Sequence, residues 1–236
     1  MSITLLLSFS ACLVYILSAF SESILTERGH VNELVIEVNK SHFYIEKFVE
    51  SRKEIFTKSY DISRHKIDSL AKILGEDVTP YMAQFLSYDS INTLLIKNVY
   101  TRGLNEKLGA EGELRGAVHD IESFVKKYDV PSVMVSMLMC RRAEKDYIMR
   151  EKEKYVGKLK NQVEALKSGI SKMNVEQDIK RNMLLFADSY QEKFTELVSV
   201  MESVKDLRSK SNTIFTNAEP ILLSLLQEKT EYARGF

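Results

Sequence analysis

The segment Met139–Arg150, M-C-R-R-A-E-K-D-Y-I-M-R, lies within a long run of helical periodicity and decides how the chain is interpreted. Around it, apolar residues recur at steps of three or four, as on the buried face of an amphipathic helix. These residues are Met134, Met137, Ile148, Tyr155, Leu159, Val163, Leu166, Ile170 and Met173. The same heptad places Arg141 and Glu144 on the apolar face, where a packed helix normally carries leucine. The sequence therefore predicts charges that face the interior of a helical bundle.

Two interpretations of these charges are open. Arg141 and Glu144 could pair with each other or with facing helices, as a buried charge pair that sets the register of the bundle. Structural ion pairs of this kind are the commoner use of buried charge. Alternatively, a cationic side chain inside a helical bundle could bind an anionic ligand.

The composition indicates a neutral, almost entirely helical protein. The 236 residues contain 33 Lys and Arg, 33 Asp and Glu, 3 Pro and no Trp. A charge-rich, Pro-poor chain of this length with sustained helical periodicity predicts one large or two small all-α domains. The sequence has no basic stripe and no aromatic platform, which argues against a nucleic-acid partner.

The chemistry-bearing residues do not form a recognisable catalytic or metal motif. The H-E-x-x-H, G-x-S-x-G and P-loop patterns are absent, so we expect no enzymatic activity and no cofactor. Cys12 lies in the N-terminal apolar run, and Cys140 is predicted to be a small core residue. A disulfide between them is therefore not expected. The four histidines, His30, His42, His65 and His119, lack the spacing of metal ligands, so we expect no metal site.

The N-terminus carries an apolar run, Ile3–Phe20, interrupted only by Thr4 and serines. As a helix the run spans about 27 Å, which is enough to cross the hydrocarbon core of a membrane. A cleaved signal peptide is the competing interpretation, but no Lys or Arg precedes the run. We therefore predict a retained transmembrane helix over residues 1–21.

Beyond the apolar run, the pattern predicts six helices. A heptad stripe from Val35 to Ile73 predicts one long helix over 22–74, about 80 Å if continuous. Gly75 and Pro80 mark a stop and a restart, and the second helix runs from Pro80 to about Arg102. A glycine-rich connection follows, and a shorter third helix runs through Tyr128.

The second half of the chain repeats this plan. We predict a long fourth helix over 131–173, a fifth after it and a sixth over about 211–236, with Pro220 as a kink or a late start. Tyr44–Phe48 weakly echoes Arg142–Asp146, which suggests an internal repeat. Two long and four short helices are expected to form two stacked four-helix bundles, a distal one over about 50–155 and a proximal one from 22–49 and 156–236.

Several cationic residues become ligand-binding candidates in this arrangement. Arg115 and His119 share a face of the third helix, and on the fourth helix Arg141 and Lys145 are expected near them. We therefore predict a distal anion-binding cavity formed by Arg115, His119, Arg141 and Lys145. Arg52 and His42, on seam positions of the first long helix, are second candidates. The opposing interpretation is that Glu144 and Asp146 neutralise the distal cations and that His42 is a satisfied core histidine.

The segments Arg141–Arg150 and Gly112–Glu122, G-E-L-R-G-A-V-H-D-I-E, resemble the helical bimodular sensor domain family. This family supplies the extracytoplasmic input domain of bacterial methyl-accepting chemotaxis receptors and of some sensor kinases. The resemblance covers about Ser21–Phe236 and implies six helices in two bundles between two transmembrane helices. Family members bind small organic acids, largely through arginines, and one member reads a periplasmic binding protein.

The resemblance implies a sensory function at the cell membrane. We expect an inner-membrane-anchored homodimer whose residues 22–236 are extracytoplasmic, bind a small organic anion and signal across the membrane. No HAMP linker or signalling domain is present in the sequence, so we expect a fragment that ends before a second transmembrane helix. The alternatives are the sensor of a histidine kinase or cyclase that reads a periplasmic binding protein, and a membrane-anchored structural helical bundle.

Overall fold

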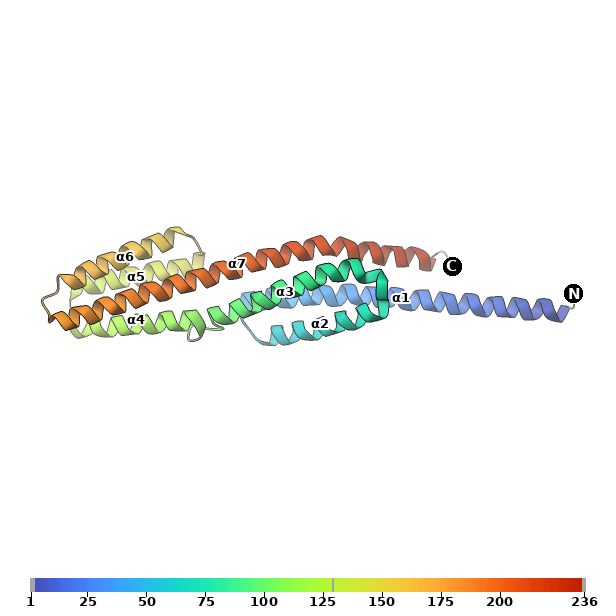
Figure 1. The fold of residues 1–236 in the computed structure, drawn as a ribbon, viewed down its shortest axis with the longest axis horizontal. Helices are drawn as coiled ribbons and strands as arrows, with labels where there is room; N and C mark the ends of the chain where they lie inside the picture. The colour runs from blue at the N-terminus through green and yellow to red at the C-terminus, as the bar shows by residue number, and fades with distance from the viewer. Residues whose placement is uncertain (1–2, 129, 235–236) are drawn as a thin grey trace. The chain divides into compact units, whose positions relative to one another are not determined.

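The computed structural model describes the backbone of residues 3–128 and 130–234, and the side-chain surroundings of 15–128 and 130–233. Within these residues the chain is all-α, as the sequence predicts (Figure 1). The elements are α1 (Ile3–Ser51), α2 (Ile55–Leu74), the 3-10 helix η1 (Gly75–Val78), α3 (Thr79–Arg102), α4 (Gly109–Tyr128), α5 (Pro131–Arg150), α6 (Lys154–Ser171) and α7 (Gln177–Arg234).

The long helices are not the ones that the sequence predicts. The expected helix over 22–74 breaks after Ser51, and the expected helix over 131–173 breaks after Arg150. Each break is a helical hairpin, because α2 packs back along α1 and α6 packs back along α5. The expected fifth and sixth helices are instead one continuous helix, α7, which contains Pro220.

Neither hairpin corner contains the glycine or proline that normally marks a helix end. The corner residues Arg52 and Glu151 adopt left-handed backbone angles, with φ of 55° and 49°. In both, the backbone N–H donates to a carbonyl one turn back, on Phe48 and Tyr147, at 2.7 Å. A left-handed non-glycine residue costs roughly 1–2 kcal/mol. Burial of the returning helix offsets this cost, for example through Tyr60 on α2.

The chain divides into two compact units whose boundaries differ from those expected. Unit 1 comprises the described residues up to Ile96 and from Leu207 onward, and unit 2 comprises Lys97–Asp206. The expected division had assumed that the first and fourth helices pass through both bundles. In the structure α3 and α7 are the helices that continue from one unit into the other.

Unit 1 is a four-helix bundle made of α1, α2, the first part of α3 and the C-terminal part of α7. Its core includes Val31, Leu34, Val38, Ile45, Phe48, Tyr60, Ile67, Phe85, Leu95 and Leu222. Polar contacts link neighbouring helices around the bundle. Tyr60 donates to Asp89 at 2.8 Å, and Ser211 donates to Asn92 at 2.7 Å.

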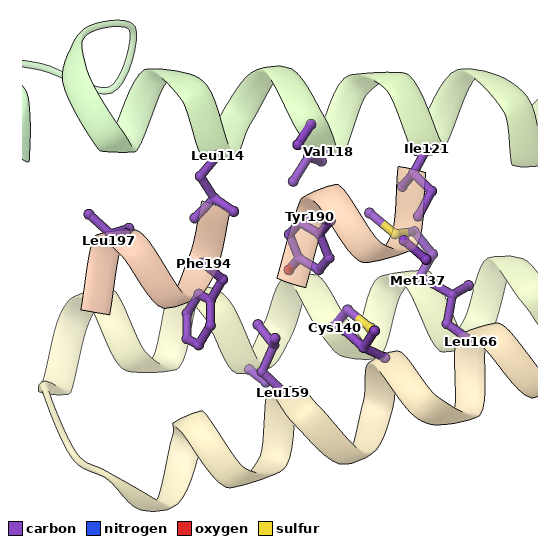
Figure 2. Packing of buried hydrophobic residues seen from close by; sticks show 14 of the residues in the cluster. Leu114, Val118, Ile121, Met137, Cys140, Leu159, Leu166, Tyr190, Phe194 and Leu197 are labelled. Atoms are coloured by element: carbon purple, nitrogen blue, oxygen red, sulfur yellow. The ribbon is translucent and has the colours of Figure 1, made fainter. Parts of the chain in front are cut away.

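Unit 2 is a second four-helix bundle, made of α4, α5, α6 and the N-terminal part of α7. Figure 2 shows how its apolar side chains point toward one another from all four helices. The core includes Leu114, Val118, Ile121, Met137, Cys140, Leu159, Leu166, Tyr190, Phe194 and Leu197. The unit therefore has its own hydrophobic core, and that core holds the candidate site in place.

The predicted membrane anchor can be assessed only in part. The side chains of residues 1–14 lie outside those that the structure describes, and they make up most of the predicted anchor, residues 1–21. Among the residues that were described, no helix combines the length and the apolar character needed to cross a bilayer.

Candidate functional site

A cavity of about 380 Å³ lies between α4 and α5 in unit 2. It is lined by Glu106, Glu111, Leu114, Arg115, His119, Arg141, Glu144, Lys145 and Ile148. On α4, Arg115 and His119 lie one helical turn apart, and on α5 so do Arg141 and Lys145. The structure thus brings together the four residues that the sequence places in a distal cavity.

Arg141 is held by carboxylates on its own and a neighbouring helix. Its guanidinium forms an ion pair with Glu144, one turn along α5, and its Nε lies 4.0 Å from Glu122 on α4. Glu144 is 5% exposed and accepts a second hydrogen bond, from the Tyr190 hydroxyl of α7 at 2.8 Å. The ion pair between Arg141 and Glu144, one of the two interpretations of the sequence, is therefore present. Arg141 lines the cavity as a paired cation.

Tyr190 is a site residue that the sequence analysis treated only as core. Its side chain is fully buried, and burial, followed by the neighbouring Glu144 carboxylate, raises the pKa of its hydroxyl. The hydroxyl therefore stays protonated and keeps donating to Glu144. Nothing in the heptad pattern distinguishes this tyrosine from an apolar core residue, so the pattern alone could not assign its role.

A second buried carboxylate lines the cavity from α4. Glu111 is 9% exposed, and its Oε1 accepts a hydrogen bond from Arg102 Nε at 2.8 Å. Arg102 ends α3, so this ion pair spans the connection between α3 and α4. The sequence analysis missed both residues. The available signal was the position of Glu111 one turn before Leu114, on the buried face of α4.

The glycine-rich connection places this end of α4. A Cβ atom on Gly103 would lie 1.9 Å from the Leu108 carbonyl oxygen, and one on Gly112 would lie 2.4 Å from the Lys107 carbonyl carbon. Gly103 also adopts a φ of 116°, which favours glycine. The expected tight connection is confirmed, and it holds Glu106 and Glu111 beside the cavity.

The rim of the cavity carries three cationic or titratable side chains with weak or no partners. Arg115 Nη1 lies 3.8 Å from the exposed Glu106, and His119 Nδ1 lies 3.8 Å from Glu122. Lys145 is exposed and has no carboxylate within ion-pair distance among the described residues. Exposed ion pairs at such distances contribute little free energy. Arg115, His119 and Lys145 are therefore the groups that can turn toward an anion.

The second candidates, Arg52 and His42, lie in unit 1 and do not line this cavity. The imidazole of His42 stacks on Phe215, with ring centroids 3.8 Å apart and 9° between the planes, and its Nδ1 lies 3.3 Å from the Tyr88 hydroxyl. Burial lowers the pKa of His42, although the Glu46 and Glu219 carboxylates act to raise it. His42 is half-buried and has Phe215 and Tyr88 as partners. Arg52 forms the α1–α2 corner.

Cys140 lies in the core of unit 2, and burial raises the pKa of its thiol to about 12, so the thiol stays protonated and is a poor nucleophile. Within the described part of the chain, no group of three or more His, Cys, Asp and Glu side chains could hold a metal ion. The cavity itself balances Glu106, Glu111 and Glu144 against Arg115, Arg141 and Lys145.

Comparisons of the chain with protein-family models, with curated proteins and with solved structures yield no match.

Proposed function

We propose that this chain is the extracytoplasmic ligand-sensing region of a transmembrane chemoreceptor of the methyl-accepting type, and that it binds a small organic anion in the cavity between α4 and α5. The observation that carries the proposal is the gathering of Arg115, His119, Arg141 and Lys145 around that cavity. The residues that carry the family resemblance supply both of its walls: Gly112–His119 on α4 and Arg141–Ile148 on α5.

The size and charge of the cavity support a small anionic ligand. A volume of about 380 Å³ lies near the lower end of the range for small-molecule sites. Lys145 has no carboxylate partner in the described region, and Arg115 has only a long contact to an exposed one. A carboxylate bound between them would form charge-assisted hydrogen bonds in a half-enclosed site, where such bonds are stronger than in open water.

The wider receptor architecture belongs to the same proposal. We propose that residues 1–21 anchor the chain in the inner membrane, that the two bundles stack as in the helical bimodular family, and that the receptor is a homodimer. The apolar run Ile3–Phe20 supports the anchor. The two separate four-helix cores support the bimodular arrangement.

The test is titration of the full-length chain in detergent with a panel of small carboxylates, using calorimetry. Lys145→Gln should weaken binding of any carboxylate that binds by about 10- to 100-fold, because it removes a charge-assisted hydrogen bond. Lys160→Gln is the matched control, because Lys160 is an exposed lysine of unit 2 that does not line the cavity. Absence of binding across the panel, or equal weakening by both variants, would exclude this anion site.

An exposed apolar patch on α5 favours a second candidate function, the sensing of a periplasmic binding protein. Val135 and Leu138 are 59% and 57% exposed, with Met139 beside them. Such patches often mark protein contacts. Leu138→Glu should abolish capture of a protein partner while leaving carboxylate binding unchanged. If neither kind of ligand binds, the remaining alternative is a structural helical bundle.

A further inference from the structure

Helix α1 carries a second periodic stripe, on the side that faces away from the core of unit 1. The core side of α1 buries Val31, Leu34 and Val38, among others. The outer stripe repeats at alternating steps of four and three residues, and all of its members are exposed. These members, which we call the outer seam, are Leu25, Gly29, Asn32, Ile36, Asn39 and Phe43. Such spacing is that of the seam along which two helices form a coiled coil.

The apolar residues and the glycine of the outer seam are not explained by contacts within the chain. Leu25, Ile36 and Phe43 are 53%, 44% and 51% exposed. Gly29 lies inside the helix, where glycine is destabilising, and a Cβ atom there would have no atom within 4 Å. A glycine in a seam allows another backbone to approach closely. The outer seam therefore has the properties of a surface that packs against a further helix.

The charges beside the outer seam match those of a second copy of α1 that runs in the same direction. In a parallel coiled coil, the residues that flank the seam form ion pairs between the two chains. Arg28 precedes one seam residue and Glu33 follows the next, so Arg28 of each copy faces Glu33 of the other. Within one chain they point about 140° apart around the helix. Neither has an oppositely charged group at ion-pair distance among the described residues.

An antiparallel arrangement fits these charges less well. The residues that precede seam positions would then face one another, and for Arg28 these are Val35 and His42, neither of which is acidic. Glu33 would face Lys40, which already pairs with Glu37 at 2.8 Å. The charge pattern therefore favours the parallel direction.

The asparagines of the outer seam also suit a parallel pair. Asn32 and Asn39 would each meet the same residue of the other copy. An amide both donates and accepts hydrogen bonds, so two of them can satisfy each other, and such a pair fixes the register of a coiled coil. Asn39 Nδ2 donates to the Val35 carbonyl oxygen at 2.9 Å, which leaves its Oδ1 and one N–H for this contact.

From these observations we infer that two copies of this chain associate in parallel through the outer seam of α1, with Arg28 of each copy paired with Glu33 of the other. The inference rests on the homodimer of the proposed function and names its interface and direction. It does not depend on the anion site.

A charge exchange tests the pairing. Sedimentation of the full-length protein in detergent, over a range of concentrations, measures the dissociation constant of the dimer. Arg28→Glu places like charges beside each other at both ends of the pairing and should raise this constant at least tenfold. Adding Glu33→Arg restores opposite charges and should return it to within about threefold of the wild-type value. Lys160→Glu is the control, because it changes the net charge equally at an exposed position of unit 2.

Disulfide cross-linking tests the direction. In the parallel pair each residue 36 meets its own copy at a separation that a disulfide can span. Ile36→Cys, in a Cys12→Ser background, should therefore give covalent dimers on mild oxidation. Ser87→Cys, at an exposed position of α3, should not. The remaining Cys140 is buried and does not interfere.

The possible failures are distinguishable. A dimer that is unaffected by Arg28→Glu, or that is not restored by the double exchange, would show that the two charges do not face each other. A dimer without the cross-link at residue 36 would exclude the parallel contact. If the wild type is monomeric at every concentration, the homodimer and the inference fail together, while carboxylate binding is unaffected.

Discussion

At the scale of single residues, Glu144 joins two helices of unit 2, α5 and α7. It pairs with Arg141 on its own helix, accepts from Tyr190 on α7, and lines the cavity beside α4. A buried carboxylate that loses a donor retains the cost of desolvation without full compensation. The fold of unit 2 and the shape of the cavity therefore depend on the same few hydrogen bonds.

Tyr190→Phe should lower the free energy of unfolding by about 1–3 kcal/mol, because Glu144 Oε2 would lose its donor. Tyr81→Phe is the control, since the buried Tyr81 hydroxyl has no side-chain hydrogen-bond partner among the residues that the structure describes. Chemical denaturation at neutral pH measures both variants. Equal effects of the two substitutions would show that the Tyr190–Glu144 hydrogen bond contributes no stability of its own.

His42→Phe should preserve the fold and remove part of its acid sensitivity. Because burial lowers the pKa of His42 in the folded protein, the unfolded chain binds a proton more readily, and stability is lost as the pH falls below about 6.5. The slope for one such group is at most about 1.4 kcal/mol per pH unit. Phenylalanine would stack on Phe215 without titrating.

Denaturation of the wild type and the His42→Phe variant at pH 7 and pH 5 tests this expectation. Carboxylate binding measured at pH 7 provides the functional comparison. A loss of carboxylate binding in the folded variant would show that His42 belongs to a ligand site after all.

At the scale of elements, the sequence predicted helix ends where glycine or proline marks them. The ends of α2 at Leu74 and of α3 at Arg102, and the start of α5 at Pro131, agree with those signals. The corners at Arg52 and Glu151 could not be found in the same way, because ordinary charged residues adopt the left-handed conformation there. These breaks are favoured only by the burial of α2 against α1 and of α6 against α5. The spacing of apolar residues within one helix contains no information about that burial.

The missed corner also shifted the predicted core of α2. A continuous helix was expected to place Ile73 on its apolar stripe, whereas the structure buries Leu74 and leaves Ile73 61% exposed. On α5 and α6 the expected core residues Met137 and Leu159 are buried. The four residues of the distal cavity were found because helical spacing alone places them on facing helices. Of their acidic partners, Glu144 was predicted, whereas Glu106 and Glu122 were missed because ion pairs between different elements are not visible in spacing.

Gly103→Ala should destabilise the α3–α4 connection by more than 2 kcal/mol, roughly the size of effect seen when backbone atoms must move apart. The added Cβ would lie 1.9 Å from the Leu108 carbonyl oxygen. Gly116→Ala is the matched control, because it lies within α4 with no atom within 4 Å of the new Cβ, and it should stabilise by about 0.5–1 kcal/mol. Thermal denaturation distinguishes the two, and similar melting temperatures would contradict the close contact.

At the scale of the whole molecule, the helices form two structural repeats, α1–α2–α3 and α5–α6–α7. The buried positions of α3 are Tyr81, Phe85, Tyr88, Asn92, Leu95 and Val99. The buried positions of α7 include Met183, Ala187, Tyr190, Phe194, Leu197 and Met201, which follow one another at the same steps of four and three. The corners Arg52 and Glu151 also correspond. The corners align one residue away from the register in which the sequence repeat was first aligned, and the buried positions of α3 and α7 align four residues away from it.

This correspondence explains why both repeats supplied ligand-binding candidates. Counted back from the corners Arg52 and Glu151, His42 occupies in the first repeat the position that Arg141 occupies in the second. In unit 1 the His42 ring stacks on Phe215. In unit 2 Arg141 lines the cavity. Sequence spacing found both positions but could not tell a stacked ring from a residue that lines a cavity.

The segment 97–206 should fold by itself, because every residue of its hydrophobic core, from Ala110 to Met201, lies within it. We expect a helical circular dichroism spectrum and a single cooperative thermal transition. A segment of the same length over 40–149 is the control, since it interrupts both bundles and should unfold non-cooperatively. Absence of a cooperative transition in 97–206 would show that unit 2 requires unit 1.

The division of α7 between the two units has a consequence for the order in which the protein matures during synthesis. Unit 2 is contiguous, so all of its helices have left the ribosome once Asp206 has emerged. Unit 1 then still lacks its fourth helix, which carries Ala218 and Leu222 into its core. Until then, the apolar side chains of the first three helices of unit 1 that pack against the fourth helix stay exposed to solvent, while unit 2 can already fold. The interval before residues 207–234 arrive is when the nascent chain is most exposed to aggregation and proteolysis.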